Sequence, residues 1–230
     1  MNYEFDFASV LERWPQFVEG AWMTVRLSFP ATVIGFVAGT LLAVGRRSSV
    51  AWLVRACGIY VEVIRNTPLL VQVFLVFFGL SSLGWQVSAF AAALLSLVIN
   101  VAAYSCEIMR AGMDSIHKGQ LEAAECLGLS RRQVYWHVIL RPAMEKVYPA
   151  LTSQFVLLML ASSITSQISV EELTAIAARV QSETFRPFEA YILVAVAYLM
   201  VSLLMRAGLW ACGQMIFTRR RRLGAQGAGR

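Results

Sequence analysis

The chain has 230 residues, of which 58% are hydrophobic and only 15% charged, and its mean hydropathy is +0.61. These values exclude an average soluble domain, which carries about 25% charged residues, and they favour a protein embedded in a membrane. The net charge of +6 would suit nucleic acid as well as lipid, so the distribution of the charges along the chain has to decide between them.

Long stretches without a charged side chain predict the membrane-spanning helices. They run over 27–45, 66–106, 147–170 and 190–205. A helix needs about 20 apolar residues to cross the bilayer core, so the second stretch can hold two helices, separated by the turn-like SSLGW at 81–85. The sequence therefore predicts an all-α membrane protein, a single domain over 1–230, with five transmembrane helices near 21–44, 59–80, 86–109, 146–165 and 188–208.

Basic residues predict the orientation of these spans. If five spans alternate, fourteen Lys and Arg side chains fall on one side of the membrane and three on the other. The richer side is expected in the cytoplasm. The N-terminus is therefore predicted outside, and the C-terminus, with its RRRR run at 219–222, is predicted in the cytoplasm beside anionic lipid headgroups.

Two of the predicted spans carry a pattern of their own. In the first span, GFVAG places Gly35 and Gly39 at GxxxG spacing, which favours close packing of helices within the chain. In the third span, polar side chains recur at helical steps on one face, at Ser96, Asn100, Tyr104 and Glu107. Polar groups are costly in lipid, so this face should look inward.

The last three residues of this stripe, Asn100, Tyr104 and Glu107, are candidates for a translocation pathway. The Glu107 carboxylate could face the ammonium or guanidinium group of a substrate. It could equally pair with Arg110, three residues away on the same helix, and be structural. Both interpretations stay open from the sequence.

The charged loop 110–145 holds EAAECLGLSRRQVYW at 122–136. A helix over its first half places Ala124 and Gly128 on one small face, and Gly128 suits the left-handed residue that ends a helix. Ser130 and Gln133 form the S-x-x-Q capping box that opens a second helix. The loop is therefore predicted to be a helix, a turn and a helix that runs through VYWHVIL into the next span.

Such a motif, with arginines at the start of its second helix, would also fit DNA binding. A DNA-binding module needs a third packed helix and a recognition helix that is free to enter the major groove. Here the second helix is short, and its apolar residues point to the membrane bundle. We therefore expect no nucleic-acid partner, and the alternative is a membrane-anchored regulator with a DNA-binding loop.

The fourth span contributes Gln154, Ser162 and Thr165 as further candidates for the pathway. Hydroxyl groups can instead bond to their own helix, and amides can bond across helices as packing contacts, so this alternative is also open. Beyond this span, 168–185 is predicted to form a short amphipathic helix. The four cysteines and two histidines are too scattered to predict a disulfide frame, a metal site or a catalytic pair.

The loop also resembles a known family. The loop resembles the EAA loop of the membrane subunits of bacterial ABC importers in its order of residues: Glu122, Ala123 and Ala124, then three residues before Gly128, then nine residues before the apolar VIL at 138–140. One departure is that the family places proline directly after the leucine, whereas here Arg141 precedes Pro142.

Three further stretches resemble permeases of the polar amino acid branch, which handles histidine, arginine, lysine, glutamine, glutamate and opines. They are YVEVIRNTPLLVQVF at 60–74, AAYSCEIMRAGMDSI at 102–116 and ETFRPFEAYILVAVAYL at 183–199. The resemblance implies a type I ABC importer permease fold in the bacterial inner membrane. It also implies a second permease subunit, two ATP-binding cassette subunits, an external solute-binding protein and a polar amino acid as substrate.

The sequence contains no G-x-x-x-x-G-K-[ST] phosphate loop. We therefore expect a transport subunit that is not an enzyme and binds no cofactor, with ATP and Mg held by the partner ATPase. Glu122, Ala123, Ala124 and Gly128 are expected to form the coupling helix that this ATPase contacts.

Overall fold

The computed structural model describes residues 4–217, so the predicted RRRR anchor lies outside the described residues. Within that range the chain is all-helical, as predicted. The elements are α1 (Ala8–Leu11), α2 (Trp14–Gly45), α3 (Ala51–Arg65), α4 (Leu69–Ser82), α5 (Ala89–Asp114), α6 (Lys118–Cys126), α7 (Arg131–Gln133), the π-helix η1 (Val134–Leu140), α8 (Arg141–Ala161), the 3-10 helix η2 (Ser162–Ile168), α9 (Leu173–Thr184) and α10 (Pro187–Ile216).

Four continuous helical segments of 4–217 are long and apolar enough to cross a membrane: α2, α5, α10 and the run from α7 to η2. The helix α3 and the helix α4 pass this test only together, and they are bent by 107° relative to each other. The predicted span 59–80 is therefore wrong as one straight helix, since it covers the end of α3, the break and most of α4. Pro68 causes the break, because it has no N–H and disfavours a helical residue before it.

The other helices extend past the predicted bounds. The predicted spans 21–44 and 188–208 lie inside α2 and α10, whereas the fourth predicted span, 146–165, is the middle of a longer helical run that begins at Arg131. The third predicted span begins three residues before α5, which then continues to Asp114. Charge-free stretches mark only the part of a helix that suits lipid, and a helix can continue into the interfaces.

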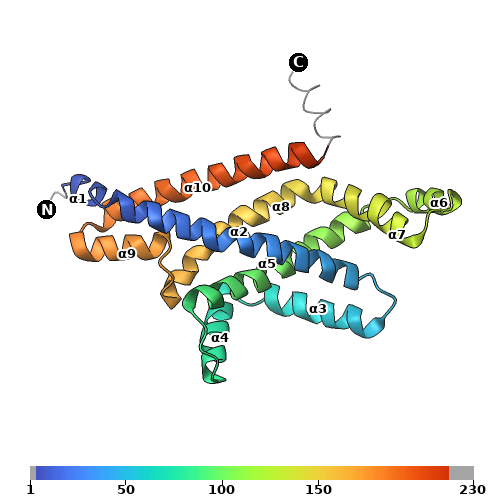
Figure 1. Ribbon diagram of the computed structural model, residues 1–230, viewed down its shortest axis with the longest axis horizontal. Coiled ribbons are helices and arrows are strands. Elements are labelled where there is room, and N and C mark those ends of the chain that lie inside the picture. Colours follow the sequence, from blue (N-terminus) through green and yellow to red (C-terminus); the bar gives the residue numbers. More distant parts are fainter. Residues whose placement is uncertain (1–3, 218–230) are drawn as a thin grey trace, which may run out of the picture.

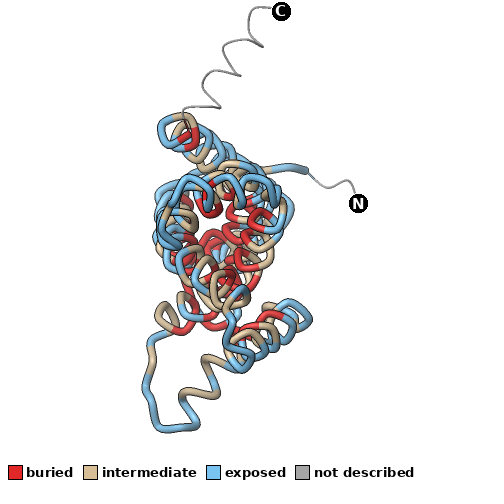
Figure 2. Tube along the Cα trace, turned by 90° about the vertical axis from the view of Figure 1, so that its right-hand side faces the viewer, coloured by how far each residue is buried: buried red, intermediate tan, exposed pale blue. Residues whose placement is uncertain are grey.

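The centre of the bundle is the contact between α2 and α5 (Figure 1). Gly35 and Gly39 of α2 face α5, and a Cβ built at Gly39 would lie 2.5 Å from the carbonyl oxygen of Ala102. The GxxxG pair is thus a packing contact within the chain, as predicted. Figure 2 shows the buried residues gathered on the inward faces of the bundle.

The bundle has two distinct ends (Figure 1). One end carries α1 and α9, and the other carries α6, α7 and the loop between α2 and α3. The predicted amphipathic helix at 168–185 is found as α9, which buries Leu173, Ile176, Ala177 and Val180. The carboxylate of Glu172 caps α9 by accepting from the N–H groups of Thr174 (2.9 Å) and Ala175 (3.0 Å).

Candidate functional site

The side chain of a glutamine forms hydrogen bonds across the break between α3 and α4. The side-chain amide of Gln72, on the first turn of α4, donates to the carbonyl oxygens of Ile64 and Thr67, both at 2.8 Å. Its oxygen accepts from Asn100 Nδ2 of α5 at 3.1 Å. Backbone groups that a broken helix leaves without partners must be satisfied inside a membrane protein, and Gln72 satisfies two of them while joining the break to α5.

A pocket of about 500 Å³ opens beside this break. Its polar lining consists of the break itself and of side chains from α3, α5 and α8: Arg65, Asn66, Thr67, Asn100, Tyr104 and Gln154. Pro68, Leu69, Leu157, Leu158 and Ala161 complete the wall. Pockets of this size, largely apolar with a few polar groups, are typical of small-molecule sites.

Three of the predicted pathway residues thus meet at one pocket: Asn100, Tyr104 and Gln154. Ser162 and Thr165 do not line it. Both are fully buried in η2, where their hydroxyls donate to the carbonyl oxygens of Met159 and Ser162. This is the arrangement that the alternative interpretation describes, in which hydroxyl groups bond to their own helix.

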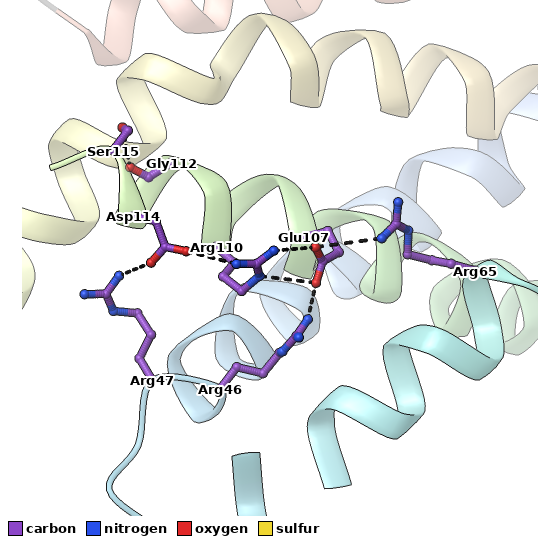
Figure 3. Close-up of polar contacts among 8 residues, drawn as sticks. All are labelled: Arg46, Arg47, Arg65, Glu107, Arg110, Gly112, Asp114 and Ser115. Carbon is purple, nitrogen blue, oxygen red and sulfur yellow. Dashed lines mark hydrogen bonds and ion pairs between the residues drawn. The ribbon is translucent and has the colours of Figure 1, made fainter. Parts of the chain in front are cut away.

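Glu107 lies farther along α5 and is surrounded by three arginines (Figure 3). Arg110 Nη2 donates to its Oε2 at 2.9 Å, and Arg46 pairs with its Oε1. Arg65 is more distant, with 3.8 Å between Nη1 and Oε2. The pairing with Arg110 follows from helical spacing, but Arg46 and Arg65 come from α2 and α3, which the sequence could not bring to this carboxylate.

The arginine cluster continues to the end of α5. Asp114 accepts from Arg110 at 3.0 Å and from Arg47 at 2.5 Å. Figure 3 shows these ion pairs running along one face of α5, from Arg65 near the pocket to Arg47 at the loop between α2 and α3. The network therefore connects the pocket wall to the end of the bundle that carries α6.

The helix α6 and its ending match the prediction. Gly128 has a φ of +72°, and two backbone bonds close the helix, from Gly128 N to Glu125 O (2.9 Å) and from Leu129 N to Ala124 O (3.2 Å). This pair of bonds is the Schellman motif. The capping box is also present, since Gln133 N donates to Ser130 Oγ and Ser130 N donates to Gln133 Oε1.

The second helix runs without interruption from Arg131 through Arg141 and Pro142. The departure from the family pattern at Arg141 therefore does not end the helix. In a regular α-helix the ring of Pro142 would meet the carbonyl of Val138, but Val138 lies in the π-helix η1.

The residues expected to contact an ATPase do not all lie on one surface. Glu122, Ala123 and Gly128 are exposed, whereas Ala124 is only 4% exposed and packs inside the chain. The proposed small face of Ala124 and Gly128 is therefore not available as one docking surface. Sequence reasoning also missed Leu127, which is 80% exposed. An apolar residue directly before the terminating glycine was the available signal.

Comparison with known proteins finds similarity to membrane components of transport systems. The family described as "Binding-protein-dependent transport system inner membrane component" matches residues 31–209. The octopine transport system permease protein OccM of Rhizobium meliloti is 34% identical over 204 residues, covering 85% of this chain and 83% of the relative. The glutamine transport system permease protein GlnP of Escherichia coli K12 is 35% identical over 205 residues, covering 88% and 93%.

Solved structures agree. The crystal structure of an amino acid ABC transporter with histidines has a TM-score of 0.84 and 37% identity, covering 93% of this chain and 100% of that one. The MetNI methionine ABC transporter, in an inward-facing conformation, has a TM-score of 0.74 at 20% identity, covering 90% and 98%, and shares the fold.

Proposed function

Because the chain belongs to the family of inner membrane components of binding-protein-dependent transport systems, we propose that it forms the translocation pathway of an ATP-driven importer and couples to a partner ATPase through α6. It is a permease subunit of an ABC importer for an amino acid or opine, in the bacterial inner membrane. Its role is transport and not enzymatic catalysis. The pocket beside the α3–α4 break is the proposed passage.

The observation that carries the coupling proposal is the position of α6. This helix stands at one end of the bundle (Figure 1), and only residues 115–117 separate it from α5. It exposes Glu122, Ala123 and Leu127. In the chain, α6 lies between α5 and the helix that begins at Arg131. A partner that binds α6 and moves it would therefore move both of these helices, and both line the pocket.

The remaining partners follow from the family. We expect a second permease subunit, two ATP-binding cassette subunits that hold ATP and Mg, and an external solute-binding protein. We expect the end of the bundle that carries α6 to lie in the cytoplasm, with the N-terminus outside and the C-terminus inside. The basic residues support this orientation, because Arg46, Arg47, Lys118, Arg131 and Arg132 all lie at the α6 end.

The alternative of a DNA-binding loop gains no support. α7 has three residues and continues through η1 into α8, so the loop offers no separate recognition helix that could enter a groove. A nucleic-acid partner is therefore not proposed.

The coupling proposal is tested by co-purification. The substitution Ala123→Trp adds bulk to the exposed surface of α6, and Ala51→Trp adds the same bulk to an exposed alanine at the start of α3, at the same end of the bundle. Gly128 is avoided, because its φ of +72° would strain any side chain. We expect a P-loop ATPase to co-purify with the wild type and with Ala51→Trp, and to be lost with Ala123→Trp.

Retention of the ATPase by Ala123→Trp would place the contact elsewhere and reject α6 as the coupling helix. Recovery of no ATPase with the wild-type chain, under conditions that preserve membrane complexes, would contradict the importer proposal itself.

A further inference from the structure

The exposed surface of α3 is divided lengthwise into a charged side and an apolar side. We infer that the charged side borders a water-filled route that leads from the pocket to the α6 end of the bundle, and that the apolar side faces lipid. The inference rests on the proposed function, since it describes how a substrate leaves the pocket towards the cytoplasm.

The division follows from the spacing of residues along α3. Residues seven apart on an α-helix point in nearly the same direction, whereas neighbours in the sequence point about 100° apart. Arg55 and Glu62 are seven apart, and both are exposed. Ala56 and Val63 are also seven apart and exposed, but each lies one position beyond its charged neighbour and points to the apolar side. Trp52, on the same side as Val63, is 71% exposed.

The depth of Glu62 requires water or a polar partner beside it. The helices α3 and α4 pass together the test for one membrane span. A rise of 1.5 Å per residue places Glu62 about 16 Å along the helix from Ala51, near the middle of a hydrocarbon core of roughly 30 Å. Charged side chains at this depth are costly in lipid, and in membrane proteins they face a partner or a water-filled cavity. The charged side of α3 therefore does not face lipid.

The charged side of α3 begins at the pocket. Asn66, which lines the pocket, donates from Nδ2 to Glu62 Oε2 at 3.2 Å and to the carbonyl oxygen of Glu62 at 2.8 Å. Arg55 lies about two turns farther along α3, towards the loop between α2 and α3 at the α6 end of the bundle (Figure 1). Asn66, Glu62 and Arg55 therefore form a continuous polar line from the pocket to that end.

The helix α5 supplies a second polar wall. Arg65 joins the two walls, with 3.8 Å between its Nη1 and Glu107 Oε2. From there Glu107, Arg110 and Asp114 follow one face of α5 to the same end of the bundle (Figure 3). The side chains of Arg110 and Asp114 are 36% and 48% exposed. Carboxylates and guanidinium groups alternate along both walls, so the route does not by itself select the charge of the substrate.

The apolar side of α3 continues into an apolar groove between α2, α3 and α5. The groove has a volume of about 490 Å³, and α3 lines it with Leu53, Cys57 and Tyr60. Leu41 of α2 lines it as well and is 66% exposed. Extended apolar surface on a helix that can cross a membrane is suited to hydrocarbon. This side of α3 is therefore assigned to lipid.

Cysteine labelling tests the two sides at matched depth. Glu62→Cys and Val63→Cys lie one residue apart, so they differ by about 1.5 Å in depth and point to different sides. Both substitutions are made in the variant Cys126→Ser, Cys212→Ser, which removes the two exposed thiols. A charged, membrane-impermeant methanethiosulfonate is added to inside-out vesicles that contain the complete transporter complex.

We expect the thiol at position 62 to react at least about tenfold faster than the thiol at position 63, because the reagent travels through water and reacts with the thiolate. The contact of Asn66 with the backbone oxygen of residue 62 does not depend on the side chain that is replaced. Arg55→Cys and Ala56→Cys form a second matched pair and should show the same contrast. This pair decides the test if Glu62→Cys fails to insert.

Equal labelling of the two members of a pair would overturn the inference, and so would faster labelling of Val63→Cys. Absence of labelling at position 62 would place the charged side of α3 against a partner subunit, and the water-filled route would be rejected.

Transport shows whether the substrate uses this route. Proteoliposomes with the complete complex and its binding protein are loaded with a radiolabelled amino acid or opine that the wild type takes up. Modification of Glu62→Cys should abolish this uptake, whereas the reagent should leave uptake by Val63→Cys unchanged. Normal uptake by modified Glu62→Cys would reject the route. If the wild type takes up no amino acid or opine, the proposed importer is rejected instead, and the labelling contrast still reports whether α3 borders water.

Discussion

At the scale of single residues, Gly39 decides how closely α2 packs on α5. A Cβ at this position would lie 2.5 Å from Ala102 O, 2.7 Å from Ser105 Cβ and 3.0 Å from Cys106 N. Two of these atoms belong to the backbone of α5 and cannot move without shifting the helix. Gly39→Ala should therefore destabilise the chain by about 1–3 kcal/mol, as overpacking does, and lower the melting temperature measured in detergent.

Gly79 provides the matched control. It lies within α4, and a Cβ there would meet no atom within 4 Å. Gly79→Ala should be neutral or should stabilise the chain by up to about 1 kcal/mol, since alanine is the better helix former. A melting temperature of Gly39→Ala equal to that of Gly79→Ala would contradict the proposed role of the α2–α5 contact.

The environment of Glu107 shows what a sequence can and cannot predict at this scale. Its pairing with Arg110 follows from the spacing of three residues along one helix, and the sequence offered this pairing as one of two interpretations. Arg46 is 61 positions away, and Arg65 is the last residue of a different helix, α3. Their approach depends on how helices pack, which periodicity within one helix does not describe.

At the scale of elements, α9 is anchored by a buried carboxylate. Glu172 is fully buried, caps α9 and accepts from the hydroxyl of Tyr198 on α10. Burial raises the pKa of the Glu172 carboxyl above its ordinary value of 4.5, although the hydrogen bonds from Tyr198 and from the N–H groups of Thr174 and Ala175 oppose this shift.

This shift predicts a pH dependence of stability. Because the folded-state pKa is raised, the contribution of Glu172 is complete below about pH 4.5 and is lost as the pH rises through the raised value. Glu172→Gln keeps an oxygen that can cap α9 and carries no charge. The melting temperature of the wild type relative to Glu172→Gln should therefore fall as the pH increases from about 4.5 upward.

Glu171→Gln is the control for this experiment. Its side chain is 61% exposed and pairs with Arg179 on the surface, so this variant should keep the pH profile of the wild type. If Glu172→Gln has the same profile as the wild type, Glu172 does not contribute in this way.

The elements that the sequence predicted best are those with local signals. The ending of α6 at Gly128 and the capping box of Ser130 and Gln133 are set by residues within one turn of each other. The bend between α3 and α4 is different. Pro68 marks where a helix can end, but no local pattern predicts the 107° angle between the helices or the bond of Asn100 on α5 to Gln72 beside the break. The hydropathy of residues 59–80 is that of one apolar stretch, and it therefore predicts one span.

At the scale of the whole molecule, the proposed orientation can be tested with the cysteines of the chain. Cys126 and Cys212 are exposed, whereas Cys57 and Cys106 are buried. In the variant Cys212→Ser, the exposed thiol left is Cys126 at the end of α6. A membrane-impermeant maleimide should label it in inside-out vesicles and not in intact spheroplasts, because the basic α6 end is expected in the cytoplasm.

The double variant Cys126→Ser, Cys212→Ser sets the background of this assay. Labelling of Cys126 in intact spheroplasts would place α6 outside the cell, where no ATPase could reach it. Addition of the ATPase should protect Cys126 if α6 is the coupling helix, so the same assay reports on the contact as well as on the orientation.

The break between α3 and α4 also bears on how the protein is made. With 15 and 14 residues and a rise of 1.5 Å per residue, the two helices are about 22 Å and 21 Å long, shorter than the roughly 30 Å of the hydrocarbon core. Neither helix is a complete insertion unit, and the polar break between them is costly in lipid until it finds partners. Gln72 satisfies two backbone groups of the break, but its own oxygen accepts from Asn100 only after the ribosome has synthesised half of α5. The apolar pair of α3 and α4 therefore gains its contact with α5 only after α5 has followed it, and the order of synthesis is not the order in which the helices become stable.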